Sequence, residues 1–207
     1  MVTPAAFWDK VAEKYDRKTV KGPNYRARIE RAAKWIGPDK RVLDAGCAGG
    51  QITLDLAPHV AHITGIDLSP KLIGYAQQRC REQGVQNAEF RVATPEDPFL
   101  EPGSFDAITA YSLLHLVDDE SSMLHRLQDL LKPGGTLIAE VPCRESIGLH
   151  FRLLIRLMTM IGKAPKVCLY SLAEHQTMFS EAGFHVQEAQ IYNPKSLSTS
   201  ILAVRKA

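Results

Sequence analysis

The sequence predicts an α/β fold: a doubly wound, mostly parallel sheet of about seven strands, with a C-terminal antiparallel β-hairpin and an N-terminal helical segment. Three observations support this prediction. Short apolar runs alternate with segments of helical periodicity, the last two strand-like runs have no helix between them, and roughly residues 4–36 form a helical segment ahead of the first strand. Apolar strands separated by helices are typical of parallel sheets that are buried on both faces.

Five strand-like runs come first along the chain. They are RVLDA (41–45), HITGID (62–67), AEFRVA (88–93), FDAITAY (105–111) and TLIAEVP (136–142), with helical patterns between them at 51–57, 70–83 and 119–131. Ser69 and Pro70 begin the helix at 70–83, because a serine hydroxyl caps free N–H groups and proline is favoured at the first helical position. The LKPGG sequence at 131–135 ends the third helix before the fifth strand.

The C-terminal third departs from strict alternation. A capping-box pattern, SLAE at 171–174, begins a helix that we expect to stop at Gly183. The strand-like runs at 185–192 and 199–207 then follow without an intervening helix. Two such strands are expected to pair antiparallel at one edge of the sheet.

Composition indicates one soluble, cytoplasmic domain over residues 1–207. The chain has 207 residues, 45% of them hydrophobic, which suffices for a single core. The net charge of +2 is too small to indicate nucleic-acid binding by itself. The four cysteines show no CxxC pairing, so we expect reduced thiols rather than a disulfide or zinc framework. No secretory signal is recognisable, and no run reaches the ~18 apolar residues of a transmembrane helix.

The first strand leads directly into a glycine-rich loop, DAGCAGG at 44–50. Glycines let the backbone approach a ligand closely and point its N–H groups at a polar group near a helix N-terminus. Asp67 ends the second strand 23 positions after Asp44. An acidic side chain at that place can accept hydrogen bonds from two ribose hydroxyls. Together these features indicate an adenosine-type ligand, without separating NAD from other nucleosides.

Four motifs carry a resemblance to a known family. VLDAGCAGG (42–50), ITGIDLSPKLI (63–73), SFDAITAYSLLHLV (104–117) and LKPGGTL (131–137) resemble, in order and in spacing, the motifs of class I S-adenosylmethionine-dependent methyltransferases of the small-molecule type. With the terminal hairpin they cover nearly the whole chain. The resemblance implies a Rossmann-like fold, S-adenosyl-L-methionine as the cofactor, and methyl transfer as the activity.

The family pattern at the first loop is commonly D-x-G-x-G-x-G. This chain matches it at Asp44, Gly46 and Gly50 and departs from it at Ala48. The resemblance implies that Asp44 and Gly46 hold the methionine part of the cofactor, with the backbone of Cys47 and Ala48 lining the loop. The methyl group of Ala48 is expected to narrow the loop without abolishing binding, provided that the φ of Ala48 is negative.

Residues that follow the second and third strands are expected to bind the adenosine part of the cofactor. The resemblance implies that Asp67 takes the ribose hydroxyls and that Leu68 packs on the adenine. Thr94 stands where the family often has an aspartate that meets the adenine amino group. Pro95 removes a backbone N–H that is often used there, which leaves the N–H of Glu96 as a substitute.

Three further side chains are candidates near the reacting centre. Tyr15, in FWDKVAEKYD (7–16), resembles a tyrosine that closes over the cofactor; the alternative is a helix that buries Tyr15 in the core. Tyr111 and His115 follow the fourth strand and are the candidates for the methyl-proximal and substrate-side positions. For His115, a general base and a structural histidine at a helix start remain open alternatives.

Two regions bear on the substrate. Residues 144–170 are unusually apolar and carry Arg152 and Arg156 four positions apart, as expected for a lid, a subunit contact or a helix on a membrane surface. Residues 10–41 hold eleven Lys or Arg against four Asp or Glu, within a predicted helical cap at 1–40. That charge suits a solvated face, an acidic small substrate, RNA or an anionic lipid headgroup.

The leading hypothesis is therefore a methyltransferase that acts on a small, partly apolar molecule, as a monomer or homodimer. No appended RNA-binding module is recognisable, so nucleic acid ranks below a small molecule. An RNA or protein methyltransferase and a non-catalytic S-adenosylmethionine-binding protein are the alternatives. His59 and His62 have no further ligand nearby in the sequence, and we predict no metal site.

Overall fold

Seven strands form one sheet in the order β3-β2-β1-β4-β5-β7-β6, in a computed structural model that describes residues 3–18, 23–162, 164–191 and 198–206. The strands are β1 (Arg41–Ala45), β2 (His62–Asp67), β3 (Ala88–Val92), β4 (Phe105–Tyr111), β5 (Leu131–Pro142), β6 (Phe184–Gln190) and β7 (Ser198–Arg205). Strands β1 to β5 pair parallel, whereas β7 pairs antiparallel with both β5 and β6. The predicted doubly wound sheet with its C-terminal hairpin is confirmed.

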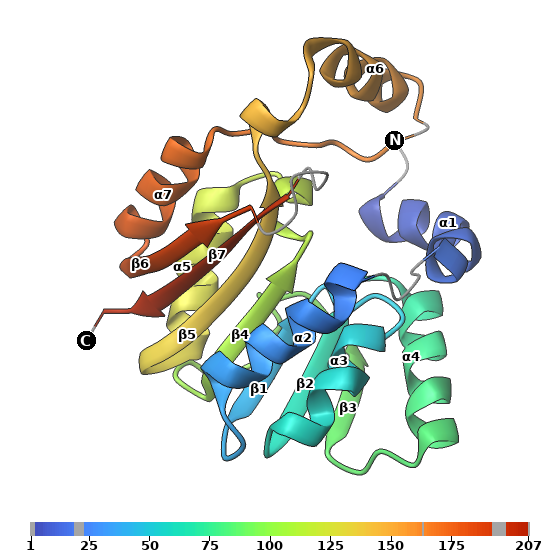
Figure 1. Cartoon of the computed structure of the whole chain (residues 1–207). Coiled ribbons are helices and arrows are strands. Elements are labelled where there is room, and N and C mark those ends of the chain that lie inside the picture. Colours follow the sequence, from blue (N-terminus) through green and yellow to red (C-terminus); the bar gives the residue numbers. More distant parts are fainter. Residues whose placement is uncertain (1–2, 19–22, 163, 192–197, 207) are drawn as a thin grey trace.

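Helices cover both faces of this sheet and the edge where the parallel strands end (Figure 1). The helices are α1 (Pro4–Lys18), α2 (Pro23–Ile36), α3 (Gln51–Leu56), α4 (Pro70–Gln83), α5 (Glu120–Leu130), α6 (Leu149–Met160) and α7 (Leu172–Glu181), with short 3₁₀ turns at Ala57–His59, Leu114–Leu116 and Arg144–Ser146. Helices α2, α3 and α4 cover one face, and α5 and α7 cover the other. Helices α1 and α6 lie beyond the carboxyl ends of the strands.

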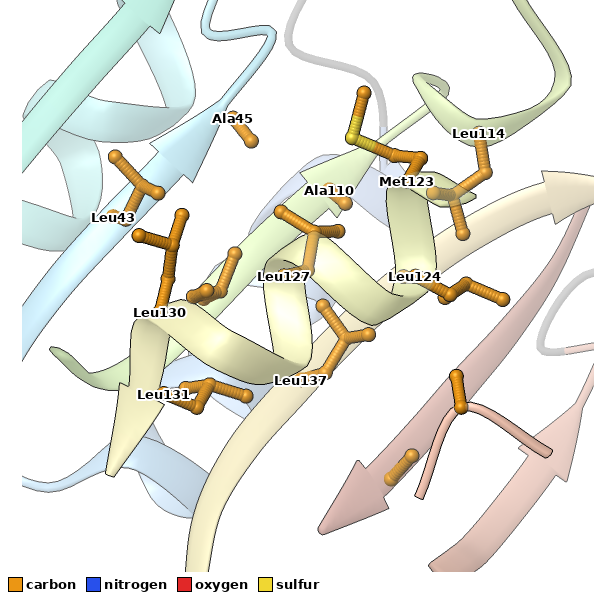
Figure 2. Packing of buried hydrophobic residues seen from close by; sticks show 14 of the residues in the cluster. Leu43, Ala45, Ala110, Leu114, Met123, Leu124, Leu127, Leu130, Leu131 and Leu137 are labelled. Atoms are coloured by element: carbon orange, nitrogen blue, oxygen red, sulfur yellow. The ribbon is translucent and has the colours of Figure 1, made fainter. Parts of the chain in front are cut away.

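The alternation of side chains along each strand divides the core into two layers. Val42 packs with α2 and the start of β2, whereas its neighbour Leu43 faces α5. Figure 2 shows Leu124, Leu127 and Leu130 of α5 lying over the sheet. All three are fully buried. Each such leucine stabilises the fold by about 2 kcal/mol, because its apolar surface leaves water.

The largest difference from the predicted boundaries is at the start of β5. We predicted a helix to Leu131 and a strand from 136, but β5 already begins at Leu131, which pairs with Phe105 before the register shifts. Proline disfavours the helical conformation at the residue before it, and Pro133 follows Lys132. The caps at Ser69 and Ser171 form as predicted, the latter as a full capping box. The predicted strands at 185–192 and 199–207 end too late, because β6 ends at Gln190 and β7 at Arg205, and Ile191 and Lys206 lie outside both strands.

Candidate cofactor and substrate site

The site lies where the direction of strand connection reverses. Strand β1 sits between β2 and β4, so the loops that follow β1 and β4 leave the sheet in opposite directions and a crevice opens between them. Gly46 lies at this crevice with φ +75°. A Cβ added to Gly46 would stand 3.2 Å from Leu113 Cδ1, so glycine keeps the two loops close together.

Two adjoining hollows occupy this crevice. The larger one, here the central pocket, is lined by Trp8 and Tyr15 from α1, by Gly46, Ala48, Asp67 and Leu68, by Thr94, Pro95 and Glu96, and by Tyr111, Ser112, Leu113, Leu116, Val117 and Met123. The smaller one, here the polar pocket, includes Tyr15, Asp16, Arg28, Asp44, Gly46, Cys47, Ala48 and Gly49. The structure thus brings together nearly all of the residues that the sequence indicated.

Asp67 lies at the floor of the central pocket. Its Oδ2 accepts a hydrogen bond from the Ala48 N–H at 3.1 Å, and its Oδ1 accepts one from the Ser69 N–H at 2.9 Å. Burial raises the pKa of this carboxyl more than the backbone hydrogen bonds lower it. Each carboxylate oxygen has a second lone pair, so the fixed side chain can still accept two hydroxyl hydrogen bonds. That geometry suits a ribose diol.

Asp44 borders the polar pocket and is fixed beneath the glycine loop, and its contact with the methionine part of the cofactor stays a prediction. It is 2% exposed, and its two oxygens accept hydrogen bonds from Thr53 Oγ1 at 2.5 Å and Thr109 Oγ1 at 2.8 Å. Burial raises the pKa of Asp44, and the two threonine hydroxyls oppose that effect. Asp44 therefore joins β1, α3 and β4 beneath the glycine loop, and it borders the polar pocket from below.

The loop conformation corrects the expectation for Ala48. Its φ is +48°, so it occupies the left-handed region rather than the negative-φ region that we required. A side chain in that region costs about 1–2 kcal/mol, because Cβ approaches the following carbonyl. In this conformation the Ala48 N–H points at Asp67 Oδ2, so the strained residue completes the floor of the site.

Gly50 is a structural residue rather than a lining one. It borders neither hollow among the described residues; Gly49 lines the polar pocket instead. A Cβ added to Gly50 would stand 2.7 Å from Ala76 Cβ and 2.8 Å from Phe90 Cε1. The glycine therefore allows α3 to begin directly against α4 and β3.

Thr94, Pro95 and Glu96 form the rim of the central pocket that follows β3. Arg126 of α5 fixes this rim, because its Nε donates to the Pro95 carbonyl at 2.8 Å. The Asp97 N–H donates to the Thr94 carbonyl at 3.0 Å, which closes a tight turn. Leu68 lies in the same pocket and presents an apolar surface to it.

Helix α1 forms one wall of both hollows. Tyr15 borders both and is 39% exposed, with its ring edge-on to Trp8 at 5.3 Å between centroids, so it is not a core residue. The helix is held at two points. Asp16 forms an ion pair with Arg79, and Asp9 accepts a hydrogen bond from the Ser69 hydroxyl at 2.5 Å.

Tyr111 stands between the two hollows at the end of β4. Its hydroxyl is buried and has no hydrogen-bond partner among the described residues. Burial, and then the nearby Glu140 carboxylate, raise the pKa of Tyr111, which keeps the phenol protonated.

Two residues of the site escaped sequence reasoning. Arg28 of α2 borders the polar pocket, and its guanidinium carbon lies 5.2 Å from the centroid of the Tyr111 ring. Only its membership of the basic segment 10–41 could have drawn attention to it. Ser112 lies in both hollows with φ +57°. No sequence signal marks a serine for the left-handed region.

His115 does not border either hollow. Its carbonyl accepts a hydrogen bond from the Cys168 N–H at 2.8 Å, and its Nδ1 is buried without a described partner. Burial, together with His175, lowers the pKa of His115 to about 4, so the ring is neutral at pH 7. The structure therefore places His115 in the wall behind the pocket, as in the structural alternative.

Comparison with known proteins gives a family match over the region that builds the site. The family described as a methyltransferase domain matches residues 42–135. A ubiquinone biosynthesis O-methyltransferase of Xanthomonas campestris pv. campestris (strain B100) is 43% identical over 107 residues, which are 51% of this chain and 44% of that protein. One of Xylella fastidiosa (strain 9a5c) is 43% identical over 98 residues, 47% of this chain and 39% of that protein. The chain thus matches less than half the length of these relatives.

Solved structures share the fold over nearly the whole chain. Magnesium protoporphyrin IX methyltransferase from Synechocystis PCC 6803, with bound SAH, has a TM-score of 0.76 at 19% identity and covers 98% of both chains. An S-adenosylmethionine-dependent methyltransferase from Mesorhizobium loti has a TM-score of 0.74 at 17% identity, over 89% of this chain and 98% of that one. The [4+2]-cyclase SpnF has a TM-score of 0.73 at 17% identity, over 98% of this chain and 95% of that one.

Proposed function

This chain belongs to the class I S-adenosylmethionine-dependent methyltransferases, and from that premise we propose that it transfers a methyl group to a small, partly apolar molecule, with an oxygen as the acceptor atom. The observation that carries the proposal is the central pocket, in which the Asp67 carboxylate lies among largely apolar side chains. The name of the O-methyltransferase relatives supports oxygen as the acceptor.

The described residues fit the cofactor S-adenosyl-L-methionine in two parts. In this proposal Asp67, Leu68 and the 94–96 rim hold the adenosine, while Gly46, the Ala48 backbone and Arg28 hold the methionine. When bound, the cofactor supplies a methyl group made electrophilic by its sulfonium. The Arg28 guanidinium would face the methionine carboxylate, since Glu140 occupies Nε and Nη2 only.

The chain's task is to position an acceptor and exclude water. Leu113, Leu116, Val117 and Met123 form the apolar side of the central pocket, and Tyr111 lines it at the end of β4. No histidine or lysine lines either hollow within the described part of the chain. We therefore propose that the acceptor reaches the site with an acidic hydroxyl, such as a phenol, which needs no strong protein base.

Calorimetric binding of S-adenosylhomocysteine tests the cofactor assignment. We expect Asp67→Asn to weaken binding by about 10- to 100-fold, because a charged acceptor of two hydrogen bonds is lost. Asp39→Asn, an exposed aspartate before β1, is the matched control. Methyl transfer from labelled cofactor to a panel of phenols, thiols and amines then tests the acceptor class. Equal binding by the wild type and Asp67→Asn would remove the proposal.

A non-catalytic cofactor-binding protein is the second candidate. This candidate is kept because the fold alone does not determine the reaction: a protein named as a [4+2]-cyclase shares the fold. Binding of the cofactor without labelled product from any acceptor would support this candidate.

We propose the cytoplasm as the compartment of the protein. We also propose that residues 1–207 form one domain and that residues 144–170 border the acceptor side of the central pocket.

A further inference from the structure

Helix α6 presents a continuous apolar face to solvent. None of its residues is buried. Six large apolar side chains of α6 and the next residue are between 50% and 77% exposed: Leu149, Leu153, Leu154, Leu157, Met160 and Ile161. We call these six the α6 face. Their spacing of three and four residues places them on one side of the helix. Figure 1 shows α6 standing away from the sheet, beyond the carboxyl ends of the strands.

The charged side chains within residues 147–170 have one sign. Residues 147–170 contain Arg152, Arg156, Lys163 and Lys166 and no aspartate or glutamate. Lys166 is already paired with Asp118 at 2.9 Å. Arg156 is exposed, and its helical position is at the edge of the α6 face. A partner must therefore offer both apolar and negatively charged groups.

A second copy of the chain does not meet this requirement. Pairing through the α6 face would bring Arg156 of both copies to one interface, and residues 147–170 supply no acidic side chain to oppose them. Like charges placed together in an interface are destabilising. An anionic lipid surface offers acyl chains to the leucines and negative headgroups to the arginines.

We infer that the α6 face docks on an anionic lipid surface, with its leucines among the upper acyl chains and Arg156 at headgroup level. The docking is peripheral, since none of the described helices is long and apolar enough to cross a membrane. A helix of this kind lies in the plane of the interface and is held by buried apolar area and by charge.

The docking face is connected to the wall of the central pocket. The chain that returns from α6 is attached to the loop after β4, because the Cys168 N–H donates to the His115 carbonyl at 2.8 Å and Cys168 Sγ lies 3.8 Å from the Val117 carbonyl. Val117 lines the pocket. If the proposed methyl transfer holds, the acceptor is therefore a lipid-phase molecule, and this consequence alone rests on the proposed function.

Vesicle co-sedimentation with the full chain tests the docking. The probes are vesicles of phosphatidylcholine and of phosphatidylcholine mixed with phosphatidylglycerol. We expect stronger binding to the mixed vesicles and weaker binding at high salt. The double variant Leu153→Ser/Leu157→Ser should lower the partition coefficient by about tenfold or more for each leucine. Arg156→Glu should lower it by at least about fivefold.

Arg81→Glu is the matched control for the charge reversal. Arg81 is exposed near the C-terminal end of α4, and Figure 1 shows that this end of the helix points away from α6, so its reversal should leave binding unchanged. Thermal melting of each variant separates a folding defect from a docking defect. S-adenosylhomocysteine binding by each variant separates a failed cofactor assignment from a docking defect. Equal binding by all variants, or none to either vesicle at low salt, overturns the inference. A dimer in light scattering that Leu153→Ser/Leu157→Ser dissociates assigns the face to a second copy and also overturns it.

Discussion

Arg28 of α2 and Glu140 of β5, which are far apart in the sequence, form an ion pair at the edge of the site. Arg28 Nε donates to Glu140 Oε1 at 2.8 Å, and Arg28 Nη2 donates to Oε2 at 2.5 Å, across 112 positions of the chain. Glu140 lies near the carboxyl end of β5 and is 6% exposed. The pair therefore attaches α2 to the strand that neighbours β4, next to Tyr111.

Removing one partner of this pair should destabilise the protein strongly. We expect Arg28→Ala to lower the free energy of unfolding by about 3 kcal/mol, because a nearly buried Glu140 carboxylate is left without its partner. The double variant Arg28→Ala/Glu140→Ala should lose less than the sum of the two single variants. Urea denaturation of all four proteins measures the coupling. Additive losses would show that the bidentate geometry contributes nothing to stability.

Gly50 and Gly84 provide a matched test of the glycine loop. Both have positive φ, +75° and +66°, but an added Cβ meets Ala76 and Phe90 at Gly50 and nothing within 4 Å at Gly84. We expect Gly84→Ala to cost about 1 kcal/mol from backbone strain and Gly50→Ala to cost several kcal/mol, since overpacking adds to the strain. Equal melting temperatures of the two variants would contradict the packing role of Gly50.

Ala48→Gly should stabilise the free protein slightly. Glycine removes the left-handed penalty of about 1–2 kcal/mol, but it gives the unfolded chain about 0.5–1 kcal/mol of additional entropy. The expected net gain is about 0.5 kcal/mol in chemical denaturation. Ala33→Gly, inside α2, is the control and should cost about 1 kcal/mol. A loss at both positions would mean that the positive φ of Ala48 carries no strain.

His115 should affect acid stability rather than catalysis. Its pKa is about 4 in the folded protein against about 6.5 in an unfolded chain, so the unfolded state binds the proton more readily between these values. The stability due to the neutral ring is complete above about pH 6.5 and is lost as the pH falls toward 4, by about 3 kcal/mol.

The variant His115→Asn should flatten this part of the stability profile and leave methyl transfer at neutral pH unchanged. Urea denaturation at several pH values between 4 and 7 measures the change in the stability profile, because this range includes both the folded and the unfolded pKa of His115. His59→Asn, at an exposed ring in the turn after α3, is the control. Loss of activity with unchanged cofactor binding would restore His115 as a candidate base.

The sheet could be predicted because its signals are local. Apolar runs of strand length, the Ser69 cap and the capping box at 171–174 act through neighbours in sequence, and each forms as expected. The early start of β5 at Leu131 was missed, because its pairing with Phe105 is a contact between distant residues. Tertiary pairing overrode the helical pattern there.

The candidate site could be predicted only where motifs are contiguous. Asp67 and Gly46 stand in short, ordered motifs, so their meeting at the crevice followed from the fold class. Arg28 depends on how α2 crosses the sheet, and Ser112 depends on a backbone angle that serine rarely adopts. For His115, the sequence could not decide between facing the pocket and lying behind it.

The attachment of α1 at Asp9 and Asp16 has a kinetic consequence. The two contacts join the helix to the first turn of α4 and to Arg79, one on each side of the wall that Trp8 and Tyr15 present to the pocket. A bound molecule can then leave on that side only after the helix detaches. Such opening steps occur in microseconds to milliseconds and often limit turnover. The dwell time of the spent methyl donor would thus be set by the two contacts that hold α1 in place.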